Sequence, residues 1–169
     1  MRFYMCSMII FFIFILPYTV VKTEDGVSSE KEKGKPTIVS HVGLIHVKGN
    51  KIVDQYDTPV ALHGMSLFWS QWGGRFYNAD CIRWLRDDWK CTVIRAVCGI
   101  QSDGYLGNPE AELAKIITVI DACIDLGIYV VVDWHDHNAE KHLQQSKEFF
   151  RTIAHKYGST PNLIYEIYN

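Results

Sequence analysis

The chain has 169 residues, of which 48% are hydrophobic and 21% charged, a composition typical of a globular protein with one core. Its formal net charge is −2, which gives no electrostatic basis for binding a nucleic acid or an anionic membrane. We therefore expect neither a nucleic-acid partner nor, once the amino-terminal signal is removed, a membrane partner.

The first residues are typical of a secretory signal peptide. Arg2 supplies a short positive region, an apolar run follows over residues 8–16, and Pro17 breaks that run. The run is shorter than the about 20 apolar residues that span a bilayer, so an uncleaved anchor is the less favoured alternative. We expect a signal peptide over residues 1–21, a secreted, extracellular protein, and a disordered charged leader over residues 22–37.

Four cysteines remain after the signal peptide, and their pairing is open. In an oxidising compartment they permit two disulfides in three pairings. Cys98 ends a predicted buried strand and Cys123 lies on a predicted helix, where a buried free thiol is equally ordinary. The four are Cys81, Cys91, Cys98 and Cys123.

After the leader, short apolar runs alternate with helical patterns. Residues 43–47 and 51–54 flank Gly49-Asn50, which predicts a β-hairpin. Asn108 and Pro109 are a typical helix start, and Gly127 is a typical helix stop. The pattern predicts strands over residues 59–66, 92–98, 128–134 and 163–168, separated by helices over 79–90, 109–126 and 139–157.

Apolar strands that alternate with helices predict an α/β fold with a parallel sheet covered on its faces. A (β/α)8 TIM barrel, which needs about 250 residues, and a small doubly wound domain both have this pattern. A doubly wound domain normally carries a glycine-rich phosphate loop after its first strand, but residues 64–69 are bulky and aromatic there. We therefore expect the first four strand–helix units of a TIM barrel, preceded by the hairpin, over residues 38–169.

Polar residues stand where these strands end, which is where barrel enzymes carry their reacting groups. Arg95 lies inside an otherwise apolar strand, so it is either a structural partner of a carboxylate or a group that orients a catalytic acid. Glu166 lies in mid-strand, and we expect it to pair with Arg95 rather than to act as the catalytic acid. His135 and Asn169 end the third and fourth strands, and His135 is expected to line a cleft.

His135 and His137 raise the alternative of a metal site. Alternate residues of a strand share a face, so both imidazoles can point toward one ion. A catalytic zinc, however, needs three protein ligands, and the sequence has no second such cluster. We therefore expect no metal and no cofactor, with His137 peripheral, and keep a metal-dependent amidohydrolase-like barrel as the alternative.

Aromatic residues gather in the loop after the first strand. Flat aromatic faces beside polar groups suit the stacking of sugar rings, and we expect Trp69 and Trp72 to bind substrate in this way. Trp84 and Trp89 lie on the first predicted helix, where we expect them to be core or packing residues.

Three segments, residues 62–70, 131–135 and 157–169, resemble glycoside hydrolase family 5. The likeness is strongest to the secreted β-1,4-endoglucanases (cellulases) of bacteria and plant-feeding nematodes, and it runs from about Ile38 to the end of the chain. The resemblance implies a (β/α)8 barrel that hydrolyses internal β-1,4-glucosidic bonds of cellulose with retention, by means of two glutamates.

The resemblance also implies roles for single residues. Arg95 would brace the nucleophile, His135 would line the cleft beside the cleaved bond, and Asn169 would bind the 2-hydroxyl of the sugar. Phe68 takes the place of a histidine that some members carry.

The same resemblance places the acid/base glutamate directly after Asn169 and the nucleophile at the end of the seventh strand. We therefore expect the chain to be an amino-terminal half-barrel without either catalytic glutamate, with open edges at its first and fourth strands, and inactive alone. A non-catalytic secreted carbohydrate-binding or effector protein is the other alternative.

Overall fold

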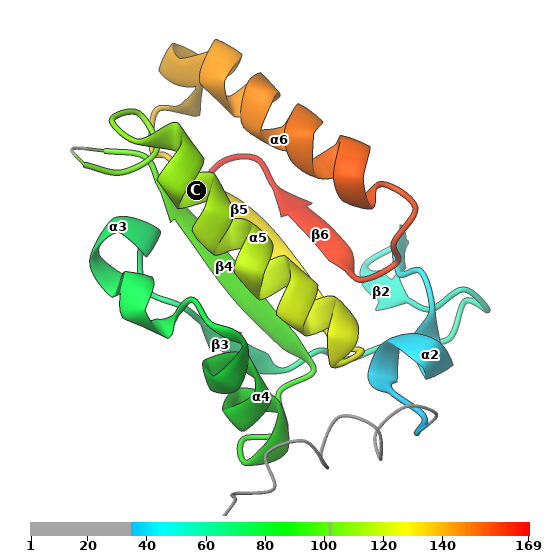
Figure 1. Cartoon of the computed structure of the whole chain (residues 1–169). Helices are drawn as coiled ribbons and strands as arrows, with labels where there is room; N and C mark the ends of the chain where they lie inside the picture. The colour runs from blue at the N-terminus through cyan, green and yellow to red at the C-terminus, as the bar shows by residue number, and fades with distance from the viewer. Residues whose placement is uncertain (1–34, 102) are drawn as a thin grey trace, which may run out of the picture. The chain divides into compact units, whose positions relative to one another are not determined.

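The computed structural model describes residues 35–101 and 103–169, so the predicted signal peptide and most of the predicted leader lie outside the described residues. Pro36–Asn169 forms a unit of its own. It contains a parallel sheet in the order β3-β4-β5-β6, with helices between successive strands (Figure 1). The strands are β3 Gly64–Ser66, β4 Val93–Gly99, β5 Tyr129–His135 and β6 Leu163–Glu166. The predicted α/β fold with a parallel sheet is confirmed.

Three helices pack against one face of this sheet, namely α4 Ala79–Asp87, α5 Pro109–Asp125 and α6 Leu143–Tyr157. Asn78 caps α4 by accepting a hydrogen bond from the Cys81 amide at 2.9 Å, and Pro109 starts α5 as predicted. No helix in the described part of the chain is long and apolar enough to cross a bilayer.

The helix boundaries differ from the predicted ones where turns intervene. Helix α4 ends three residues before the predicted Lys90, because Lys90 takes a positive φ of 56° and turns the chain toward β4. The third predicted helix begins as a 3-10 turn, η2 Ala139–His142, before α6. The short helices α3 Ser70–Gly73 and η1 Gly74–Phe76 were not predicted.

A small apolar cluster lies at the amino-terminal ends of the strands. It joins Tyr129 at the start of β5 to Val39 and Val42 of α2 Ile38–Val42. The sequence did not predict α2, and Thr37, assigned to the leader, caps it by accepting a hydrogen bond from the Ser40 amide at 3.1 Å. The predicted hairpin is present as β1 His46–Lys48 and β2 Lys51–Val53.

The first parallel strand is shorter than predicted, with β3 covering only Gly64–Ser66 of the predicted 59–66. Pro59 instead bridges antiparallel to Val53, and the Val60 amide donates to the Ile52 carbonyl at 2.9 Å. Residues 59–60 therefore pair with strand β2 of the hairpin, and only Gly64–Ser66 pair with the parallel sheet.

Strand register brings charged residues onto the sheet face opposite the helices. Asp133 is paired with Glu166 on one side and Val97 on the other. Since successive residues of a strand point to opposite faces, Arg95 shares the face of Val97, whereas Cys98 points into the core under the helices. In the described part of the chain, β3 and β6 each pair on one side only, so both are open edges, as predicted.

Candidate active site

Arg95 is the centre of a polar cluster on the face opposite the helices. Its Nε and Nη2 atoms donate to the two carboxylate oxygens of Glu166 at 2.7 and 2.8 Å. Nη2 also lies 2.9 Å from Asp133 Oδ2 and 3.0 Å from the Asn169 side-chain oxygen. The predicted pairing of Arg95 with Glu166 is confirmed, and the cluster joins β4, β5, β6 and the residue that ends the chain.

The two acids of this cluster differ in electrostatic state. Hydrogen bonds from Arg95 lower the pKa of Glu166, and the same contact raises the pKa of Arg95. Glu166 is therefore held ionised, with both oxygens engaged, and is poorly suited to donate a proton. This arrangement agrees with the expectation that Glu166 is not the catalytic acid.

Asp133 is a further member of the cluster, at a strand end where the sequence indicated polar residues but no role for this one. It is fully buried at 0% exposure, and burial raises its pKa to about 6 against the opposing effects of His135 and Arg95. Its Oδ2 lies 2.8 Å from His135 Nδ1, while its Oδ1 is buried without a hydrogen-bond partner among the described residues. The sequence signal for this contact is the spacing, because an acid two positions before His135 lies on the same face of the strand.

Asn169 is held in place from two directions. Arg95 donates to its side-chain oxygen, and Nδ1 of His137 lies 3.2 Å from both its side-chain nitrogen and its backbone oxygen. The Tyr168 hydroxyl donates to the His137 carbonyl at 2.8 Å. His137, expected to be peripheral, is exposed but contacts the residue predicted to bind the sugar.

An aromatic stack stands beside this cluster. Trp69 and Trp72 are nearly parallel, at 7°, with ring centroids 5.0 Å apart, and the Trp69 ring lies 4.5 Å from that of His135. Trp72 is 56% exposed, so its ring presents free surface next to the polar groups. The predicted substrate-binding tryptophans and His135 thus come together, and Phe68 packs against both tryptophans.

Trp84 and Trp89, expected to be core or packing residues, lie outside the core and pack only on each other among the aromatic rings of the described residues. They are 51% and 54% exposed, with ring centroids 5.8 Å apart in an edge-to-face pair. Helix α4 buries Ile82 and Leu85 instead, and it ends at Asp87, so helical spacing does not extend to Trp89.

All four cysteines of the described part of the chain are free, which overturns the alternative of two disulfides. Cys98 faces the core from β4 and Cys123 from α5, and burial raises the pKa of both thiols. The interpretation of these two residues as buried free thiols is confirmed.

A metal site finds no support in the donor geometry. Residues 35–101 and 103–169 contain no group of three His, Cys, Asp or Glu side chains arranged to hold an ion. The His135 and His137 rings meet edge-to-face with centroids 5.6 Å apart, and Nδ1 of His135 is engaged by Asp133.

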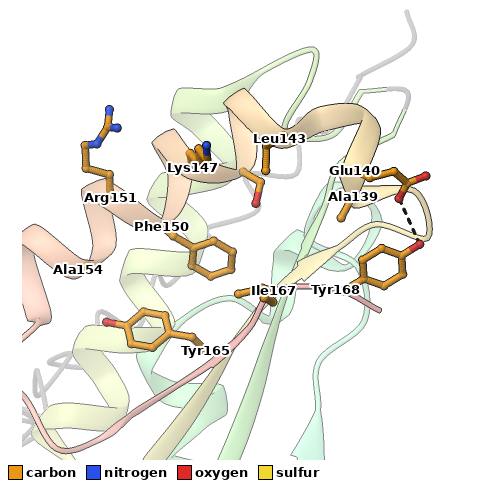
Figure 2. A pocket seen from close by; sticks show the side chains of 11 residues that line it. Ala139, Glu140, Leu143, Lys147, Phe150, Arg151, Ala154, Tyr165, Ile167 and Tyr168 are labelled. Carbon is orange, nitrogen blue, oxygen red and sulfur yellow. Dashed lines mark hydrogen bonds between the residues drawn. The ribbon is translucent and has the colours of Figure 1, made fainter.

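An apolar groove of about 700 Å³ lies beside β6 (Figure 2). Helix α6 forms one wall, and Tyr165, Ile167 and Tyr168 form the other. Phe150 of α6 faces Tyr165 and Ile167 across it, and at one end the Tyr168 hydroxyl lies 3.3 Å from the Glu140 carboxylate. The groove is on the helix-covered side of β6, and it contains none of the residues of the Arg95 cluster.

A parallel sheet with helices on one face and polar residues such as His135 at the carboxyl ends of its strands is the arrangement of α/β barrel enzymes. The family profile described as cellulase (glycosyl hydrolase family 5) matches residues 53–169. The chain belongs to glycosyl hydrolase family 5.

Relatives and solved structures agree with this assignment. The chain is 44% identical over 129 residues to endoglucanase Z of Dickeya dadantii, covering 74% of this chain and 30% of that protein. It is 46% identical over 114 residues to endoglucanase A of Evansella cellulosilytica, covering 66% of this chain and 23% of that protein. The chain therefore spans less than a third of the length of either relative.

Two solved structures show the same fold. A protein from Cytophaga hutchinsonii superposes with a TM-score of 0.78 at 54% identity, covering 79% of this chain and 44% of that one. The catalytic domain of Thermobifida fusca endoglucanase Cel5A (E5) gives 0.75 at 35% identity, covering 79% and 45%. A variant of the Thermobifida domain has been solved with cellotetraose.

Proposed function

We propose that the whole protein is a secreted endoglucanase that hydrolyses internal β-1,4-glucosidic bonds of cellulose with retention, and that residues 1–169 alone are inactive. The observation that carries the proposal is the cluster of Arg95, Glu166 and Asn169 beside an exposed tryptophan stack. The names of the endoglucanase relatives support the substrate class, and the apolar amino-terminal segment supports secretion.

The acids of the described cluster do not provide the reacting pair. Retaining hydrolysis needs two carboxyl groups about 5–5.5 Å apart, one as acid/base and one as nucleophile. Glu166 is tied at both oxygens to Arg95, and Asp133 is fully buried. We therefore propose that both catalytic glutamates belong to further residues of the protein, the acid/base directly after Asn169 and the nucleophile at the end of a seventh strand.

Within such a site the described residues have supporting tasks. Arg95, already extended toward Asn169 at 3.0 Å, would orient the nucleophile and favour its ionised form. Asn169 would hold the 2-hydroxyl of the sugar, and Trp69 and Trp72 would stack on neighbouring sugar rings. The open β6 edge and the apolar groove beside it suit a further strand–helix unit that would continue the sheet.

The proposal is tested first on the transcript. We expect a glutamate codon directly after that of Asn169, and a stop codon or a non-acidic residue there would overturn the assignment of the acid/base. The longer product should hydrolyse carboxymethylcellulose and release the β-anomer first, as proton NMR of the reducing end reports. Purified 1–169 should show no hydrolysis above a no-enzyme control, because removal of a general acid alone costs about 10²–10⁴-fold in rate.

The exposed tryptophan stack also favours a second candidate, a secreted protein that binds cellulose without cleaving it. The chain would then sediment with cellulose, and the transcript would end at Asn169. Sedimentation combined with turnover by the longer product would exclude this candidate.

A further inference from the structure

We propose that Asp133 is a positioning residue that keeps the proton of neutral His135 on Nδ1 and so leaves Nε2 as a hydrogen-bond acceptor in the site. The importance of this tautomer for catalysis rests on the proposed function, whereas the Asp133–His135 contact and the tautomer itself do not.

The geometry of the pair carries the first step. Asp133 Oδ2 lies 2.8 Å from His135 Nδ1, and both residues belong to β5, two positions apart on one face of the strand. An ionised carboxylate can only accept hydrogen bonds, so Nδ1 must be the donor. In a neutral imidazole the nitrogen that donates fixes the other nitrogen as the acceptor.

The surroundings hold both partners in this geometry. Asp133 is fully buried and His135 is 8% exposed, so water does not compete strongly for their contact. Trp69 packs against the His135 ring with centroids 4.5 Å apart and planes tilted by 58°. In the described part of the chain, Nε2 of His135 has no hydrogen-bond partner, which leaves it free to accept from a hydroxyl group of a ligand.

Charge pairing with Arg95 alone does not account for Asp133. Arg95 already makes a two-point contact with Glu166, so its charge is matched without a second acid. Burying an additional carboxylate with one unpartnered oxygen, Oδ1, costs free energy. Besides its contact with Arg95 at 2.9 Å, this carboxylate adds one with His135, and an aspartate in the same position relative to an imidazole holds it in one tautomer in Ser-His-Asp triads.

The test reads the tautomer directly by long-range ¹H–¹⁵N NMR of the full chain labelled with ¹⁵N-histidine, at pH 8, above the pKa of Asp133. We expect His135 to show a protonated Nδ1 and an unprotonated Nε2. Loss of the signals in His135→Gln assigns them. A His135 ring protonated mainly on Nε2 in the unmodified chain would overturn the proposal without any variant.

Two substitutions of Asp133 distinguish an effect on the His135 tautomer from a general loss of structure. Asp133→Asn keeps an oxygen acceptor and should retain the Nδ1–H tautomer, whereas Asp133→Leu removes it and should shift His135 toward the Nε2–H form of a free imidazole. His142, whose Nδ1 lies 2.6 Å from Asp136 Oδ2, should keep its signals in both variants, and exposed His155 gives the free-imidazole reference. An unchanged His135 tautomer in a folded Asp133→Leu chain would also contradict the proposal. Because no activity is measured, this result is independent of whether the protein cleaves cellulose.

Discussion

Arg95 and Glu166 lie 71 positions apart in sequence and meet through two parallel hydrogen bonds of 2.7 and 2.8 Å. The contact reaches from β4 across β5 to β6, the last strand of the described sheet. It pairs the charge of a partly buried arginine that stands in an otherwise apolar strand. It also removes Glu166 from the set of free acids and orients the guanidinium toward Asn169.

Replacement of Arg95 by lysine should destabilise the protein. A lysine ammonium cannot reproduce the planar two-point contact with Glu166, and the remaining contacts to Asp133 and Asn169 would be weakened with it. We expect the free energy of unfolding to fall by about 2 kcal/mol, less than for a fully buried pair, as measured by urea denaturation. Arg151→Lys, on the exposed surface of α6, should change it by less than about 0.5 kcal/mol. Equal stability of the two variants would contradict the structural role of Arg95.

Asp133 should make stability fall as pH rises through the weakly acidic range. Its pKa is raised from 3.8 in the unfolded chain to about 6 in the folded one, so the folded state binds the proton more tightly. The stabilisation is complete below pH 3.8 and is lost as pH rises toward 6, by up to about 3 kcal/mol.

Comparison of the unmodified chain with Asp133→Asn, by urea denaturation between pH 4.5 and 7, isolates this contribution. The variant should lack the decline. The lowered pKa of Glu166 acts in the opposite direction, below its ordinary value of 4.5, and is common to both proteins. The charged and titratable groups facing Asp133 are Arg95, His135 and Glu166, and parallel pH profiles of the two proteins would refute the prediction.

Trp72→Ala should weaken the binding of cello-oligosaccharides. An aromatic stack contributes about 0.5–1.5 kcal/mol, so we expect the dissociation constant for cellotetraose to rise about fivefold in calorimetric titration. Trp84→Ala is the matched control, because Trp84 is similarly exposed and paired with another tryptophan but lies on α4, which covers the sheet face opposite the polar cluster. The same loss of affinity in both variants would show that stacking at Trp72 is not specific.

The free state of the cysteines predicts their reactivity. In the folded chain a maleimide reagent should modify Cys81 slowly and spare Cys91, Cys98 and Cys123, which are buried and whose thiols have raised pKa values. In guanidinium without reductant, all four should react, as mass spectrometry of peptides reports. A pair that resists labelling until a reductant is added would reveal a disulfide.

Local sequence signals predicted the parts of the structure that depend on neighbouring residues. Asn78 and Pro109 mark the starts of α4 and α5 where predicted. Gly127 stops α5 with a positive φ of 64°, and a Cβ there would approach the Thr37 side chain to 2.3 Å. Helix α2 was not predicted because five residues are too few to show a helical periodicity. Its stability comes from the Thr37 cap and from packing on Tyr129.

The candidate site was predictable where a charged residue stands among apolar neighbours in the sequence. Arg95 stood out as a charge in an apolar strand, and its partner Glu166 followed from the need to neutralise it. Asp133 did not stand out, because its significance depends on the register that places it beside Glu166 and on its complete burial. The exposed positions of Trp84 and Trp89 likewise depend on where α4 ends.

Periodicity, helix caps and short motifs are local properties of the chain, so the alternation of four parallel strands with α4, α5 and α6, and the membership of a glycosidase family, follow from the sequence alone. Tertiary packing adds which polar groups meet, the unpaired state of the cysteines among the described residues, and the acid behind His135. Those outcomes depend on strand register and burial, which arise when residues distant in sequence compete for the same space, and no single segment encodes them.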